Sequence, residues 1–282
     1  MWQTETKIVA DTLKKVAEAK GSQDTGWIMH HVLDSRQLDL TPFGVVNLPQ
    51  IHLFGIDISI TKHVVFMWIA FILLVVTLRY VAKSYRKSLV PKGITNLTEV
   101  LIVFVRDEIV KPTIGKGSER FIPYLLTVFF FILTCNFLGL IPYGSTATSN
   151  IAVTATLATI SFVVIQIGGM MKNGAVGYFK GLIPHGIPAW LLPIMFIVEI
   201  LGLFTKPFAL AIRLFANMTA GHVVILALLG LIFILHTYFV VPVSISFALF
   251  IFLLEILVAL IQAYIFTMLS SLFIGMAVHQ EH

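Results

Sequence analysis

The chain has 282 residues, of which 58% are hydrophobic and only 12% are charged. A soluble domain carries about a quarter charged residues, so water cannot be the only solvent of this chain. The net charge of +5 does not indicate nucleic-acid binding, because the basic residues gather between two apolar segments and form no stripe with aromatic residues. The composition predicts an all-α, polytopic transmembrane helix bundle at 63–282 behind a polar N-terminal tail at 1–62.

The first apolar span covers about residues 63 to 80, and a basic loop follows it. Four acids in this region stand against nine basic residues, which are Arg79, Lys83, Arg86, Lys87, Lys92, Arg106, Lys111, Lys116 and Arg120. By the positive-inside rule, the loop at 83–120 is cytoplasmic and the N-terminal tail is external. Within the loop, NLTEVLIVFVRDEIV predicts a short amphipathic helix that starts with Asn96 as its cap and ends before Pro112.

The second and third spans cover about residues 121 to 141 and 151 to 170, joined by an uncharged external turn. Asn136, in the second span, and Asn150, at the end of the turn, are weaker candidates for lining a channel. The hydroxyls of the third span are expected to bond their own helix or a neighbouring one, and they belong to Thr154, Thr156, Thr159 and Ser161.

The C-terminal third is apolar over two segments that are too long for one perpendicular crossing. Residues 189 to 235 would form a helix of about 70 Å, more than twice a bilayer core. This segment holds either two spans broken near Lys206 and Pro207, or one short span followed by a long, tilted helix. The last segment, 243–278, is overlong in the same way. We expect the ion path on these two helices, at 189–236 and 243–278.

Charged residues are rare in this region, and between residues 181 and 280 they are limited to Glu199, Lys206, Arg213 and Glu255. A charge near the bilayer centre costs a few kcal/mol, so such residues face protein or water and mark ion paths. Structural ion pairing or snorkelling to the interface is the alternative, and it applies most to Glu199 and Lys206.

Their spacing predicts a polar helix face. Glu199, Lys206 and Arg213 are seven residues apart, and Asn217 follows Arg213 at i+4, so the four share one face if Pro207 does not rotate it.

On the same basis His222 points away from the Arg213 face, about 180° round the helix. On the last helix, Glu255 and Gln262 are also seven residues apart and share one stripe. A Glu and a His from different helices could form a buried pair that exchanges protons, whereas the alternative for His222 is a hydrogen-bonded core histidine.

The segments LFTKPFALAIRLFANMTAGH at 203–222 and EILVALIQAYIF at 255–266 together resemble the a subunit of rotary (F-type) ATP synthases. The resemblance extends to NFLGLIP at 136–142, to MHHVLDS in the tail, and to the order of tail, basic loop and two overlong helices.

The resemblance implies a stator subunit with two half-channels, which pass ions to and from a rotating ring of hairpin proteolipid subunits. Each ring subunit would carry one buried carboxylate, and ion flow would be coupled to ATP synthesis. Arg213 matches the family's essential arginine, which favours the ionised ring carboxylate and separates the half-channels. Glu199 and Lys206 match positions toward the cytoplasmic exit.

Asn217 and Gln262 match family positions that line the region around the arginine. The alternative is that these two amides only hold helices together. In some members a Glu stands at the position of His222 and a His at that of Glu255. The two are exchanged here, so the pair keeps one carboxylate and one imidazole, and we interpret the exchange as preserving the outer half-channel.

Further partners implied by the resemblance are a peripheral stalk subunit and, indirectly, a soluble ATPase head, with the lipid bilayer as solvent. The implied location is the bacterial cytoplasmic (inner) membrane, with the C-terminus in the cytoplasm. Whether the ion is a proton or sodium stays open.

No cofactor or metal is expected, and the chain itself is expected to be non-catalytic. TIGKGSER departs from a P-loop at Val110 and Gly117, so it encodes no nucleotide site. His30 and His31 with Asp34 lack a spaced third metal ligand. The main rival function is a secondary ion-coupled transporter, which would show two related halves, and no such symmetry is evident.

Overall fold

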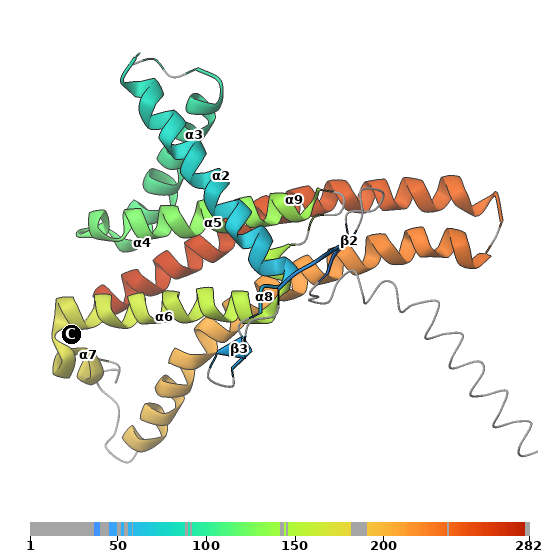
Figure 1. The fold of residues 1–282 in the computed structure, drawn as a ribbon. Helices are drawn as coiled ribbons and strands as arrows, with labels where there is room; N and C mark the ends of the chain where they lie inside the picture. Colours follow the sequence, from blue (N-terminus) through green and yellow to red (C-terminus); the bar gives the residue numbers. More distant parts are fainter. Residues whose placement is uncertain are drawn as a thin grey trace, which may run out of the picture. The chain divides into compact units, whose positions relative to one another are not determined.

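The computed structural model describes residues 37–39, 45–49, 52–53, 56–57, 59–87, 90, 92–141, 144, 146–181, 191–235 and 237–279 (Figure 1). The chain forms two compact units, which we describe separately. One comprises residues 1–62 and 219–254, and the other comprises residues 63–218 and 255–282. The two longest helices each contribute to both units.

In the described part of the first unit, two short antiparallel strand pairs precede the membrane helices. Strand β1 (Gln37–Asp39) pairs with β2 (Val45–Asn47), and β3 (His52–Leu53) pairs with β4 (Ile56–Asp57). The same unit contains the second part of helix α8 (Leu192–Leu235) and the first part of α9 (Val240–Val278). There the Ser244 hydroxyl donates to the carbonyl of Leu228, which satisfies a buried polar group inside an apolar hairpin.

Five of the described helices are long and apolar enough to cross a bilayer. Besides α8 and α9 they are α2 (Lys62–Tyr85), α5 (Ile122–Gly139) and α6 (Ile151–Asn173). These bounds confirm the predicted fold class and fall close to the predicted spans. Apolar runs of this length form helices because lipid offers no partner to an unpaired backbone N–H or C=O.

Helix α8 excludes the first of the two alternatives that the sequence left open for its 47-residue apolar segment, which was two spans broken near Pro207. It is one helix of 44 residues with Pro207 inside it, so the chain does not break at Lys206 and Pro207. At 1.5 Å per residue α8 is about 66 Å long, and the 39-residue α9 is about 58 Å long. Both exceed the thickness of a bilayer core.

The basic loop folds into a series of short helices, and two details of the sequence prediction were wrong. Helix α3 (Ile94–Phe104) begins at Gly93, whose φ of 59° favours glycine, so Asn96 lies inside the helix and does not cap it. The chain continues through a π-helical turn, η1 (Val105–Val110), into α4 (Lys111–Ile114). Pro112 lies in the first turn of α4, where a proline needs no N–H partner, so the helix does not end before it.

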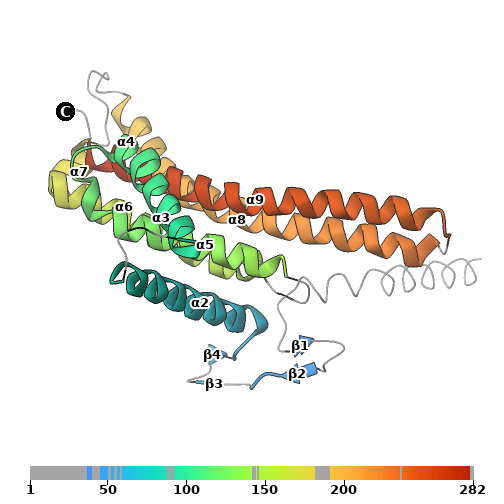
Figure 2. The same ribbon diagram turned by 90° about the horizontal axis from the view of Figure 1, so that it is seen from above.

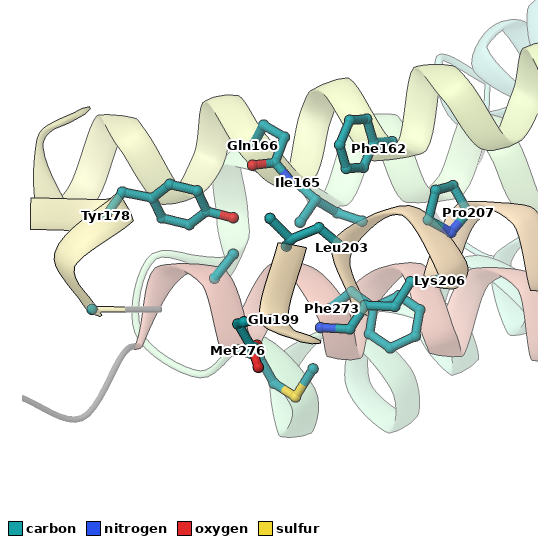
Figure 3. Close-up of a pocket in the computed structure, with 12 residues that line it drawn as sticks. Phe162, Ile165, Gln166, Tyr178, Glu199, Leu203, Lys206, Pro207, Phe273 and Met276 are labelled. Carbon is teal, nitrogen blue, oxygen red and sulfur yellow. The ribbon is translucent and has the colours of Figure 1, made fainter. Parts of the chain in front are cut away.

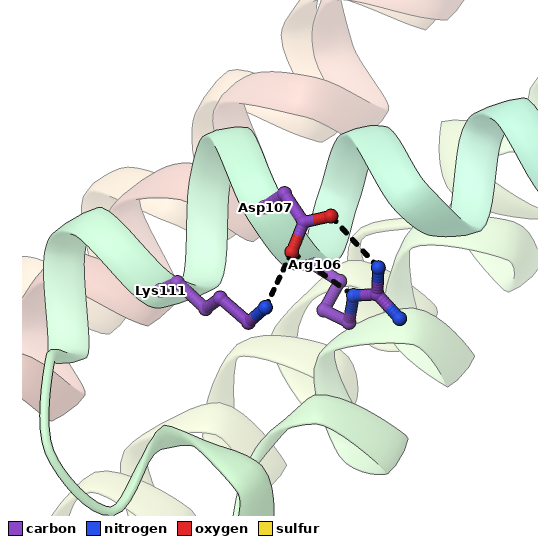
Figure 4. Close-up of polar contacts among 3 residues, drawn as sticks. All are labelled: Arg106, Asp107 and Lys111. Atoms are coloured by element: carbon purple, nitrogen blue, oxygen red, sulfur yellow. Dashed lines mark hydrogen bonds and ion pairs between the residues drawn. The ribbon is translucent and has the colours of Figure 1, made fainter.

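A charge cluster lies on the π-helical turn (Figure 4). Arg106 donates two hydrogen bonds to Asp107, at 3.0 and 2.8 Å, and the ammonium of Lys111 lies 2.7 Å from the same carboxylate. Arg106 and Lys111 hold the pKa of the Asp107 carboxyl well below its usual range. The pKa of Asp107 is lower in the folded chain than in the unfolded chain. The charge cluster therefore stabilises the fold above the ordinary carboxyl pKa, and this contribution is lost as the pH falls through the folded-state pKa.

The second unit has an apolar core to which several segments contribute. Fully buried residues come from η1, α5, α8 and α9, among them Ile109, Leu125, Ile132, Leu214 and Phe266. Helices α5, α6 and the C-terminal part of α9 lie side by side in both views (Figures 1 and 2). Dispersion between such close-packed side chains holds membrane helices together, since lipid tails are as apolar as the core.

Hydrogen bonds between helices join the same unit at separate points. Tyr124 and Ser161 link α5 to α6 at 2.7 Å, and the Asn173 amide donates to the carbonyl of Ala277 at 3.0 Å, linking α6 to α9. Thr154, Thr156 and Thr159 bond carbonyls of their own helix. The prediction for these hydroxyls is therefore confirmed.

Helix α9 approaches α4 closely at Gly275. A Cβ placed there would lie 2.2 Å from the carbonyl oxygen of Thr113, and backbone cannot yield as a side chain can. At Gly202, also inside a helix, a Cβ would meet nothing within 4 Å.

We therefore predict that Gly275→Ala destabilises the chain by about 1–3 kcal/mol through overpacking. Gly202→Ala is the control, and it should be neutral or stabilising because alanine favours helix. Thermal unfolding of the purified protein in mild detergent measures both. Equal melting temperatures for the two variants would contradict the close approach of α9 to α4.

Candidate functional site

Two helices carry the residues that the sequence singled out. Helix α8 bears five of them, Glu199, Lys206, Arg213, Asn217 and His222, and α9 bears Glu255 and Gln262. Glu255 and Gln262 both lie on the buried face of α9, with 4% and 1% of their surface exposed, which confirms that they share a stripe.

Arg213 lies on an open face of α8. Its neighbour Leu214 is fully buried in the core, whereas the side chain of Arg213 is exposed. Among the described residues, no hydrogen bond or ion pair engages its guanidinium. A permanently charged group on an apolar helix needs a counter-charge or water, so the partner of Arg213 lies outside the described part of this chain.

The face around Arg213 carries small side chains. Ala209 and Ala216 are exposed beside it, as is Asn217. Small residues on a membrane helix let another helix approach closely. This face can therefore bring the guanidinium near a group on a neighbouring helix.

Asn217 and Gln262 meet. The Asn217 amide nitrogen donates to the amide oxygen of Gln262 at 2.7 Å, which joins α8 to α9 one turn beyond Arg213. Gln262 is buried while Asn217 is exposed, so the bond ties the open face of α8 to the interior of the unit. The structure thus brings together two residues that lie 45 positions apart in the chain.

Glu199 and Lys206 line one cavity of about 200 Å³ (Figure 3). This shared lining confirms that these two residues lie on the same face of α8, despite Pro207. The ammonium of Lys206 lies 5.3 Å from the centre of the Phe273 ring, a cation–π distance. Both charged side chains are half-buried, and neither forms an ion pair with a described residue.

The opposite wall of this cavity holds two polar residues that the sequence analysis missed, Gln166 of α6 and Tyr178 of α7 (Ala175–Gly181). The side-chain nitrogen of Gln166 is buried without a hydrogen-bond partner among the described residues. Burial raises the pKa of the Tyr178 hydroxyl; the polar side chain of Gln166, which lies close to this hydroxyl, opposes the rise, and the charge of Glu199 adds to it. A lone amide in an apolar span was the signal for Gln166, whereas nothing in the sequence marked Tyr178.

His222 and Glu255 belong to different compact units, so the structure does not test their predicted pairing. Glu255 is buried and His222 is half-buried, and neither is without an interaction partner. His222 and Glu255 are thus polar side chains on two largely apolar helices.

The weaker channel candidates have clear local roles. Asn136 is fully buried; its amide nitrogen donates to the carbonyl of Ala259 at 3.2 Å, and its oxygen accepts from Thr148 at 2.7 Å. These bonds join α5, α9 and the turn η3 (Ala147–Ser149). Asn150 caps α6, because its oxygen accepts from the backbone N–H of Ala152 at 2.9 Å.

In the described part of the chain, no cluster of three or more His, Cys, Asp or Glu residues could hold a metal ion. His30, His31 and Asp34 lie outside the described residues.

Comparison with known proteins gives a consistent result. The family model described as ATP synthase A chain matches residues 64–275. The chain is 55% identical over 258 residues to ATP synthase subunit a of Chloroherpeton thalassium, covering 90% of this chain and 77% of that protein. It is 54% identical over 264 residues to ATP synthase subunit a 2 of Chlorobaculum tepidum, covering 92% and 75% of the two chains. Subunit a of Myxococcus xanthus is 54% identical over 229 residues, covering 80% and 75%.

The bonds of Asn136 predict the effect of removing its partner. Thr148→Val leaves the buried oxygen of Asn136 unpaired and should cost about 1–3 kcal/mol of stability. Thr156→Val is the matched control, since the exposed Thr156 bonds only its own helix, at 2.7 Å. Thermal unfolding in detergent compares the two, and an equal effect of both substitutions would contradict a structural role for Asn136.

Proposed function

The chain belongs to the ATP synthase A chain family, and from this membership we propose that it is the stator ion-channel subunit of an F-type ATP synthase. In this role it provides two half-channels that pass protons to and from a rotating ring, and so couples proton flow to ATP synthesis. The observation that carries the proposal is Arg213, a permanent charge on an apolar helix with no partner among the described residues.

The proposed partner of Arg213 is a carboxylate on a ring of hairpin proteolipid subunits. In a contact that excludes water, a guanidinium lowers the pKa of a nearby carboxyl and favours its ionised form. A ring subunit that reaches Arg213 therefore gives up its proton to the exit path. The exposed alanines on the same face support this contact, because they allow a ring helix to come close.

Arg213 also acts as a barrier in this proposal. A fixed positive charge opposes the direct passage of a proton between the half-channels, so protons must travel on the ring. The bond between Asn217 and Gln262 supports this role by holding α8 against α9 next to the arginine. An amide pair cannot take up or release a proton near neutral pH, so it positions the barrier and does not bypass it.

The cavity lined by Glu199 and Lys206 is the proposed cytoplasmic half-channel. Its two charged groups attract water into an otherwise apolar wall, and a carboxylate there can accept and release protons. The outer half-channel is assigned to His222 and Glu255 on their residue types, since a carboxylate and an imidazole both exchange protons.

The further partners follow from the same family membership. A peripheral stalk subunit would hold this chain still against the ring, and a soluble ATPase head would carry the nucleotide chemistry. We place the protein in the bacterial cytoplasmic membrane, with the tail at 1–62 outside and the loop at 83–120 and the C-terminus in the cytoplasm. No observation favours the alternative of a secondary transporter.

We predict that Arg213→Ala assembles normally but abolishes ATP synthesis and raises passive proton leak. The substitution removes a costly membrane charge, so insertion should not suffer, while the barrier between the half-channels is lost. Arg213→Lys should also fail largely, because an ammonium lacks the planar fork and can lose its proton when desolvated.

Assembly, synthesis and leak should be measured in the same vesicles, with Arg86→Ala as a control for an exposed basic residue outside the site. An assembled Arg213→Ala variant that makes ATP at the normal rate would refute the proposal.

A second prediction concerns the exchanged pair. His222→Glu or Glu255→His alone leaves two like groups in one path, whereas the double exchange restores one acid and one base. ATP-driven proton pumping of the double variant should therefore exceed that of the worse single variant. Strictly additive losses in pumping would count against a shared path.

A further inference from the structure

We propose that Gln166 and Tyr178 form a polar wall opposite Glu199 and position the water through which protons cross the cavity. This inference rests on the proposed function of that cavity as a half-channel, and it adds two residues from α6 and α7 to a path otherwise assigned to α8. Neither side chain changes its protonation in this role, so both are positioning residues.

The first observation is the amide of Gln166. Its nitrogen is buried and has no hydrogen-bond partner among the described residues, although the side chain lines the cavity. A buried amide donor left unpaired is costly, so such a group normally bonds water when it borders a space that can hold it. A volume of about 200 Å³ holds several water molecules, since one occupies about 30 Å³ in the liquid.

The second observation is that Tyr178 is held in place. Only 2% of its surface is exposed, and a Cβ at Gly169 would lie 2.4 Å from its ring, so the glycine makes room for the aromatic side chain. The hydroxyl points from α7 toward the side of the cavity that Gln166 and Leu203 line (Figure 3). A rigid ring thus presents one polar atom to the cavity.

The third observation is the distribution of charge around the cavity. Glu199 and Lys206 lie on α8, whereas Gln166 and Tyr178 contribute neutral donors from the other side. Water between the walls can donate to the carboxylate of Glu199 and accept from the amide of Gln166. Such a molecule is oriented, and an oriented chain of water passes protons to and from the carboxylate without a charge on α6.

A cysteine in place of Gln166 tests whether water reaches this side of the cavity. The probe is a small, water-soluble alkanethiosulfonate, applied to vesicles of the whole complex from each side separately. It reacts with thiolates, which form in contact with water and not in lipid. Gln166→Cys should be modified, whereas Ile167→Cys, next to it on the lipid-exposed surface of α6, should not.

The unsubstituted chain gives the background, since its single Cys135 is buried. Equal modification of the two variants, or none above background, would overturn the inference. This measurement does not depend on whether the chain conducts protons.

Conductance tests the functional half of the inference. In vesicles of the complex stripped of its soluble head, Gln166→Leu and Tyr178→Phe should each lower passive proton conductance about threefold to tenfold, the contribution of one hydrogen bond. Gln166→Asn keeps the amide and should retain more conductance than Gln166→Leu. Ile167→Leu is the control, and assembly should be equal in all variants.

The outcomes separate the two proposals. If Glu199→Gln lowers conductance but Gln166→Leu and Tyr178→Phe do not, the inference fails and the proposed half-channel stands. If none of the three changes conductance, the assignment of this cavity as a half-channel fails as well.

Discussion

The hydrocarbon of a bilayer offers no hydrogen-bond partner, and this constraint decides the placement of every polar group in the membrane helices. Several hydroxyls bond a carbonyl one turn back in their own helix, as Thr156 and Thr267 do. Buried amides instead join separate helices, as Asn136 and Asn173 do. Polar residues in the spans thus fix where the helices meet, while apolar packing supplies most of the adhesion.

Arg213 and Gln166 are among the polar groups that depart from this rule, and they do so in different ways. Arg213 is unpaired among the described residues but exposed, so its partner must approach from outside the unit. The amide nitrogen of Gln166 is unpaired among the described residues but buried, so its partner must fit inside the cavity that it lines. In the proposed function, burial thus separates a contact for another subunit, at Arg213, from a space for water, at Gln166.

The sequence predicted the helices well because a membrane span is set by length and apolarity alone. It was wrong at the start of α3, where Gly93 with its positive φ precedes the first turn and Asn96 forms no cap. It left open whether the chain breaks at Pro207, and α8 continues through that proline because lipid offers no partner to unpaired backbone groups.

Helical spacing predicted those parts of the candidate site whose residues lie on one face of a single helix. Glu199 and Lys206 share a wall of the cavity as their spacing requires, and Asn217 lies on the exposed face with Arg213. Gln166 and Tyr178 were not found, because they reach the cavity from other helices and no spacing rule connects them to α8. Composition also could not show that both ends of the Asn136 amide are bonded.

The helix face that carries Glu199, Lys206 and Arg213 changes its surroundings along its length. At Glu199 and Lys206 α8 borders the cavity that α6, α7 and α9 also line, whereas at Arg213 its face is open. Lys206 and Arg213 are two turns apart, or about 10 Å along the axis. A proton leaving the ring beside Arg213 would therefore need only a short step to reach the cavity. Arg213 and Lys206 are both basic, so in the proposed path the proton would leave along Glu199 and the neutral side chains of Gln166 and Tyr178.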